Sequence, residues 1–221
     1  MIKLNSKSRK LILLQRNELL SNTQILLRKR FGRFLFTNFF VYFFQINNLD
    51  NSVQNLFEKE YETIKNFLPA NVSNILDIGC GLGIINIFLN KRYNQNTKFF
   101  LLDKNKIDLK IKYGFSENYE SYNNLNETKN ILLANGLVEN QVILKNVDRN
   151  IDIDQKIDFI LSLKSMAFHY PIENYFKLLS KICTKNTKFI FDISTERYKI
   201  SDLQKYFEKI EIIYEEDSQH P

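Results

Sequence analysis

The stretch 74-NILDIGCGLGIINIFLN-90 changes its pattern twice within 17 residues. It opens with an apolar run around Asp77, continues with Gly79, Gly81 and Gly83, and closes with an apolar helical pattern over 84–88. This order predicts a β-strand, a tight turn and an α-helix. Because glycines tolerate positive φ and let a ligand approach the backbone closely, the turn is a candidate binding site.

The spacing of the turn argues against a dinucleotide. The dinucleotide fingerprint has its third glycine three positions after the second, and that position holds Ile84. The carboxylate of Asp77 at the strand tip would repel a diphosphate, but it suits a ligand that carries an ammonium and a sulfonium group. A buried strand and a glycine turn that bind nothing are the alternative.

The residues 77-DIGCGLG-83 resemble motif I of the class I S-adenosylmethionine-dependent methyltransferases. The resemblance implies an α/β, Rossmann-like, doubly wound and mostly parallel sheet, with S-adenosyl-L-methionine as cofactor and S-adenosyl-L-homocysteine as product. It makes Asp77, Gly79, Cys80, Gly81 and Gly83 cofactor-binding residues. The family normally ends with an antiparallel strand for which this sequence shows no counterpart, so that strand is either absent, supplied differently or outside the given sequence.

Two further strands end in candidate cofactor contacts. The strand predicted over 98–103 ends in Asp103, 20 residues after Gly83, where an acidic residue can accept both hydroxyls of a ribose; Lys104 follows it. A solvated loop aspartate is the alternative. For the strand predicted over 141–147, the resemblance implies an adenine contact at its end, with Asn146 as the best match. Val147 and Asp148 are the other candidates there.

A fourth strand, predicted over 158–163, leads into a segment dense in reactive side chains. Ser162 is a further cofactor candidate there, and Tyr170 a substrate candidate. His169 is the predicted general base, because histidine titrates near neutrality; the alternative is a histidine that only holds the following turn. Lys164 is a second catalytic candidate that would orient an acidic substrate or lower its pKa, unless it is merely exposed.

The remaining segments extend the α/β alternation. A polar, tyrosine-rich loop within 107–136 offers Tyr122 and Asn123 as substrate or cofactor contacts, with local packing as the alternative. After it we predict a helix over 172–183, a strand over 188–193, a helix over 201–209 and a strand over 210–215.

The N-terminal part, residues 1–68, reads as a basic, aromatic-rich helical extension or lid on a methyltransferase-like domain over 69–221. Residues 1–33 hold nine Lys or Arg against one Glu, a formal charge of +8 that leaves about −2 for the rest. Amphipathic helices are predicted over 8–30, and a helix over 51–68 capped at 50–52. The aromatic segment 34–46 is too short to span a membrane, so it packs on the body, pairs a homodimer, covers the substrate or meets a membrane surface.

Composition limits the classes of function. The chain suffices for one α/β domain with an appendage. Cys80 and Cys183 match neither a disulfide framework nor a metal site, which favours a reducing, cytoplasmic location, with peripheral attachment to an anionic membrane as a further option. A body that is not basic weakens the case for extensive nucleic-acid contact.

The predicted function is methyl transfer to a small-molecule hydroxyl by in-line displacement. The segment 162-SLKSMAFHYP-171 and the tyrosine-rich insertion resemble small-molecule O-methyltransferases, including sugar methyltransferases, so the acceptor could be a sugar or glycan precursor. Three alternatives stay open: an RNA methyltransferase that grips RNA with the basic arm, a membrane-associated enzyme with a lipid-linked substrate, and a non-catalytic interaction protein.

Overall fold

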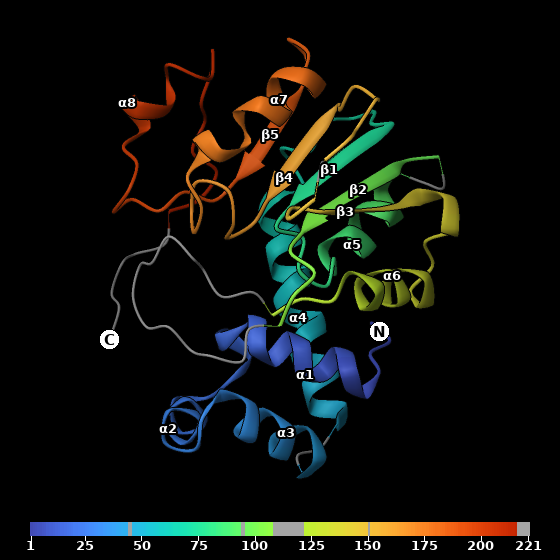
Figure 1. Ribbon diagram of the computed structural model, residues 1–221, viewed down its shortest axis with the longest axis vertical. Coiled ribbons are helices and arrows are strands. Elements are labelled where there is room, and N and C mark those ends of the chain that lie inside the picture. Colours follow the sequence, from blue (N-terminus) through green and yellow to red (C-terminus); the bar gives the residue numbers. More distant parts are fainter. Residues whose placement is uncertain (44–45, 94–95, 108–121, 150, 216–221) are drawn as a thin grey trace.

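A computed structural model describes residues 1–43, 46–93, 96–107, 122–149 and 151–215 (Figure 1). Its centre is a five-stranded sheet of β1 (Asn74–Ile78), β2 (Lys98–Asp103), β3 (Val142–Asn146), β4 (Phe159–Ser162) and β5 (Lys188–Phe191). The strand order is β3-β2-β1-β4-β5, and every neighbouring pair is parallel. This is the order of the doubly wound α/β fold, so the predicted fold class is confirmed.

Successive strand residues point to opposite sides of the sheet, so apolar side chains project from both faces. Helices cover both of these faces. One face packs against α4 (Ile46–Ile64), α5 (Ile85–Tyr93) and α6 (Leu125–Ala134), and the other against η3 (Ile172–Tyr175), α7 (Phe176–Ile182) and α8 (Ile200–Leu203). In β2, Phe99 and Leu101 belong to the first core, whereas Phe100 and Leu102 belong to the second. Figure 1 shows α5 and α6 across the sheet from α7.

The helix before the sheet begins earlier than predicted. We expected a cap at 50–52, but α4 begins at Ile46, and Asp50 lies buried within the helix. There its carboxylate accepts hydrogen bonds from Nε and Nη2 of Arg9 at 2.8 and 2.7 Å. The polar residue that looked like a cap is therefore the partner of an arginine on another helix, a long-range contact that local pattern cannot reveal.

The C-terminal prediction was wrong in two places. The helix expected over 201–209 is only the short α8, and residues 210–215 form no strand. Ile212 and Tyr214 are 53% and 66% exposed, whereas Ile210 and Ile213 are half-buried against the core, so the segment packs without pairing as a strand. Within the described part of the chain, all strand pairs of the sheet are parallel.

The extension before α4 consists of α1 (Ser6–Gln15), η1 (Asn17–Leu19), α2 (Asn22–Phe31) and α3 (Arg33–Phe43). Figure 1 shows this group at one end of the sheet, around the lower part of α4. The residues 11–14 of α1 are all buried, and Phe40 and Val41 of α3 are buried as well. Part of the aromatic segment therefore packs on the body of the protein, one of the roles expected for it; residues 44 and 45 lie outside the described residues.

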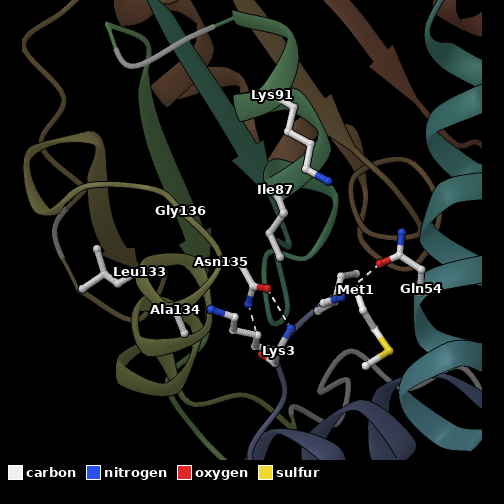
Figure 2. A pocket seen from close by; sticks show the side chains of 10 residues that line it. Met1, Lys3, Gln54, Ile87, Lys91, Leu133, Ala134, Asn135 and Gly136 are labelled. Carbon is white, nitrogen blue, oxygen red and sulfur yellow. Dashed lines mark hydrogen bonds between the residues drawn. The ribbon is translucent and has the colours of Figure 1, made fainter. Parts of the chain in front are cut away.

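The first residues of the chain are held in place by side chains of the body (Figure 2). Lys3 N donates to Asn135 Oδ1 at 2.7 Å, Asn135 Nδ2 donates back to Lys3 O at 3.0 Å, and Ile2 N donates to Gln54 Oε1 at 3.1 Å. A hollow of about 410 Å³ lies beside these contacts and is lined also by Ile87 and Lys91 of α5. It contains none of the predicted site residues.

Several cationic side chains of the basic N-terminal arm, residues 1–33, make ion pairs or hydrogen bonds with other residues of the protein. Besides the pair that Arg9 makes, Arg16 Nη2 lies 2.9 Å from a carboxylate oxygen of Glu60, and Arg28 donates to Leu13 O and to Asn17 Oδ1. Lys29 and Arg30 remain exposed. Among the described residues no helix is long and apolar enough to cross a membrane.

Candidate functional site

The glycine turn has the backbone that its sequence predicts. Gly79, Gly81 and Gly83 have φ of 73°, 53° and 68°, in the left-handed region that side chains with a Cβ rarely occupy. The N–H of Gly79 donates to Leu102 O at 2.7 Å, which ties the turn to the end of β2. The strand–turn–helix unit therefore presents its turn at the carboxyl edge of the sheet, where open α/β sheets bind ligands.

Two protein segments approach this turn very closely. A Cβ at Gly79 would lie 2.2 Å from Cβ and Oγ of Ser165, and a Cβ at Gly81 would lie 2.9 Å from Oε1 of Gln15. Gln15 Nε2 in turn donates to Tyr122 O at 2.8 Å. Because Gly79 and Gly81 have no side chain, the loop after β4 and the end of α1 can pack directly against the turn.

Asp77 is the most deeply buried carboxylate of the site. It is 3% exposed, and its Oδ2 accepts a hydrogen bond from Nδ2 of Asn86 at 2.7 Å. Burial raises its pKa to about 7; the negative charge of Asp103 raises it further, whereas Asn86 and Arg16 act in the opposite direction. A carboxylate in this environment would gain much from a cationic ligand.

Asp103 lies at the end of the neighbouring strand. Its Oδ2 accepts from Gly81 N at 2.7 Å, and its Oδ1 accepts from the N–H of Lys104 at 2.6 Å. Burial raises its pKa to about 6, against the lowering effect of these hydrogen bonds. Because a carboxylate oxygen can accept more than one hydrogen bond, Asp103 could also accept from the hydroxyls of a ligand, in competition with the hydrogen bond that Asn123 makes to it.

The candidates from the tyrosine-rich loop are both buried. Asn123 is 3% exposed, and its Nδ2 donates to Gly81 O at 2.9 Å. It also hydrogen-bonds Asp103 and so lowers the pKa of that carboxyl. Tyr122 packs under the guanidinium of Arg33, 4.9 Å from the ring centroid, and against the ring of Phe34. Asn123 thus supports the turn, and Tyr122 joins it to the N-terminal extension.

The candidates after β3 lie beside Asp103. Asn146 is the register partner of Asp103, and its Oδ1 accepts from Asp148 N at 3.1 Å. The N–H of Val147 donates to Asp103 O at 3.0 Å. Asp148 itself is exposed. The three residues share the edge of the sheet with the carboxylates of Asp77 and Asp103.

The loop after β4 is folded tightly onto β1. The hydroxyl of Ser162 donates to Ile78 O at 2.8 Å and accepts from Met166 N at 2.8 Å, so this side chain fixes the loop. Lys164 has a φ of 60°, and its ammonium pairs with Glu18 from the extension. A non-glycine residue in this conformation costs energy, which the contacts around it must offset.

His169 lies two residues beyond the buried part of this loop. Its N–H donates to Ser165 O at 2.9 Å, and its ring meets the Phe168 ring edge-on at 4.9 Å between centroids. The residue is exposed, yet partial desolvation and the charge of Lys164 lower its pKa. Tyr170, the other candidate here, lies under the ammonium of Lys104, 5.4 Å from its ring centroid.

Cys80 lies within the turn and is half-buried. Burial raises the pKa of its thiol well above the ordinary value, so the group stays neutral and unreactive. No cluster of three metal-binding side chains occurs in the described part of the chain.

Sequence reasoning missed the contribution of the extension to this site. Gln15, Arg16 and Glu18 lie beside Gly81, Glu60 and Lys164 respectively. Each of these contacts joins two residues that are 44 or more positions apart in the sequence, so no local motif announces it.

Comparison with known proteins gives matches only among solved structures. No family model and no curated protein matches the chain. The ribosomal protein L11 methylase of Lactobacillus delbrueckii subsp. bulgaricus is 16% identical, covering 65% of this chain and 62% of that chain at a TM-score of 0.42. A methyltransferase of Thiobacillus denitrificans, bound to S-adenosyl-L-homocysteine, is 15% identical (61% and 46% covered, TM-score 0.40). Precorrin-6y C5,15-methyltransferase of Geobacter metallireducens is 13% identical (67% and 68% covered, TM-score 0.46).

Three of the matches extend well beyond the matched region, since the chain spans 54%, 38% and 62% of their length. The neighbours described above are methyltransferases by name, but identities below 25% and TM-scores below 0.5 support no conclusion about activity. The fold assignment comes from the order and direction of the strands themselves.

Proposed function

We propose that the protein binds S-adenosyl-L-methionine and transfers its methyl group to a small-molecule hydroxyl, such as that of a sugar or glycan precursor. The observation that carries the proposal is the pair of carboxylates at adjacent strand ends around a glycine turn, Asp77, which is buried, and Asp103, which is half-buried. Asp77 would hold the ammonium of the cofactor, and Asp103 the ribose hydroxyls.

The charge of the site favours this cofactor over a dinucleotide. Both carboxylates repel a diphosphate, and the position of the third dinucleotide glycine is Ile84, 1% exposed in the core. Entry of any ligand along the Cβ side of the turn requires the side chains of Gln15 and Ser165 to move, because they fill that space.

The chain would contribute alignment and proton removal to the reaction. When bound, S-adenosyl-L-methionine supplies an electrophilic methyl group on its sulfonium. The protein must then hold the acceptor oxygen in line and take up its proton, for which His169 is the candidate base. Its lowered pKa leaves the imidazole neutral, and so able to accept a proton, at neutral pH.

Incubation with methyl-labelled S-adenosyl-L-methionine and separate pools of sugars, nucleotide sugars and RNA tests the reaction. Label in a hydroxyl of the small-molecule pool supports the proposal. Label in RNA would favour the RNA methyltransferase instead. If the protein does not bind S-adenosyl-L-methionine and labels nothing, an interaction protein on this fold becomes the better account.

A specific feature favours attachment of the enzyme to a membrane surface. Five of the large apolar side chains that are exposed lie on α2 and α3, namely Leu26, Leu27, Phe31, Leu35 and Phe39, with 46–64% of each exposed. Lys29 and Arg30 are exposed beside them. We infer that this apolar, basic surface meets anionic lipid, because the apolar side chains would enter the headgroup region while the cations pair with phosphate.

Sedimentation with vesicles of phosphatidylcholine, with and without phosphatidylserine, tests the membrane surface. We expect binding to the anionic vesicles that falls with salt and is lost in the double variant Leu35→Ser, Phe39→Ser. Ile212→Ser, another exposed apolar residue, is the matched control and should bind like wild type. Equal binding of all variants, or a wild-type dimer in solution that these two substitutions dissociate, would overturn the membrane assignment.

A further inference from the structure

Arg16, the residue that follows α1, has a hydrogen-bonding capacity that its neighbours do not use up. Its side chain is 12% exposed, and the guanidinium lies 4.9 Å above the Phe57 ring centroid. Nη2 donates to Glu60 at 2.9 Å. Nη1 is buried without a hydrogen-bond partner among the described residues, and lies 3.6 Å from an oxygen of Glu18.

This arrangement is unfavourable unless a further acceptor joins it. A buried N–H that lacks an acceptor costs the desolvation of that group. Glu18 does not fully relieve the cost, since its carboxylate also pairs with Lys164. The planar fork of an arginine fixes two donors in one plane, so Nη2 can stay with Glu60 while Nη1 donates a charge-assisted hydrogen bond to an incoming carboxylate.

The position of Arg16 near the glycine turn indicates which ligand carboxylate it would bind. Gln15, the preceding residue, touches Gly81 of the turn, and the positive charge of Arg16 acts directly on Asp77. A cation and an anion at the same turn are the complement of an α-amino acid group, whose ammonium would go to Asp77. We propose that Arg16 forms the subsite for the carboxylate at the amino-acid end of the cofactor. This inference rests on the proposed function.

The extension would then be part of the binding site rather than a cover over it. Another arginine of the same extension provides the comparison. Arg9 already makes a two-point contact with Asp50, so its fork has no place for a ligand. Both arginines are mostly buried and ion-paired, which makes Arg9 the matched control for Arg16.

Calorimetry with S-adenosyl-L-methionine and with its decarboxylated form measures how much the carboxylate contributes to the affinity. For wild type and for Arg9→Gln we expect the complete cofactor to bind about tenfold more tightly, or more, than the decarboxylated one. In Arg16→Gln that preference should vanish, with the affinity for the decarboxylated form unchanged. Arg16→Lys keeps the charge and serves if the glutamine variant unfolds; it should lose much of the preference because lysine has no fork.

Two results would contradict the inference in different ways. If Arg16→Gln and Arg16→Lys keep the wild-type preference, or weaken both ligands equally, the carboxylate lies elsewhere and only the subsite is wrong. If wild type binds neither ligand, the proposed function itself fails, and the subsite with it.

Discussion

Replacement of Asp77 by asparagine should remove a pH-dependent loss of stability. The ordinary pKa of an aspartate is 3.8, and burial raises that of Asp77 to about 7 in the folded protein. Between these values the folded state binds more protons than the unfolded state, so the free energy of unfolding falls as the pH rises. For these two pKa values, the loss between pH 5 and pH 8 is about 3 kcal/mol, and Asp77→Asn should not show it.

Urea unfolding of wild type and variant at several pH values between 5 and 8 measures this effect. The quantity of interest is the difference in unfolding free energy between the two proteins, because titrating groups that do not interact with Asp77 cancel in it; Asp103, which does interact with it, contributes to the difference. That difference should shift in favour of Asp77→Asn by about 3 kcal/mol across the range. Asp154→Asn, at an exposed position, controls for the lost negative charge. Parallel curves for wild type and Asp77→Asn would refute the reasoning.

Three further predictions concern the same site. The affinity for S-adenosyl-L-homocysteine should rise as the pH rises through about 7, since the ligand ammonium needs the ionised form of Asp77; titration calorimetry at pH 5.5 and 8 checks this, and a flat profile contradicts it. Gly79→Ala should destabilise the fold by more than Gly136→Ala, because both glycines have positive φ but only at Gly79 would the Cβ meet a neighbour, Ser165, at 2.2 Å; thermal melts that rank them the other way would argue against it. His169→Ala should leave cofactor affinity intact and lower turnover about a hundredfold or more, whereas unchanged turnover would exclude it as the base.

The sequence was sufficient for the central elements of the fold. The strand predicted over 98–103 has those bounds in the structure, and the strands are parallel, as their alternation with helices predicted. The glycines of the turn have the positive φ that their type suggested. These features are local, since strand pattern and glycine backbone are set by neighbouring residues.

What could not be predicted depends on contacts between distant segments. The position of α1 against the turn arises from the burial of its apolar residues between α3 and the body, and Gln15 and Arg16 are brought to the site by that packing. The strand predicted over 210–215 does not form: Ile210 and Ile213 are half-buried against the core, whereas Ile212 and Tyr214 are exposed. Apolar pattern shows that a segment can be buried but does not say against what.

Thermal shift with S-adenosyl-L-homocysteine, beside the same measurement with NAD, tests the central claim most directly. The account predicts stabilisation by S-adenosyl-L-homocysteine, about 2.7 kcal/mol at a hundredfold excess over its Kd, which corresponds to several degrees in Tm. NAD should have no effect, because Asp77 and Asp103 repel its diphosphate. A shift with NAD alone would contradict the account.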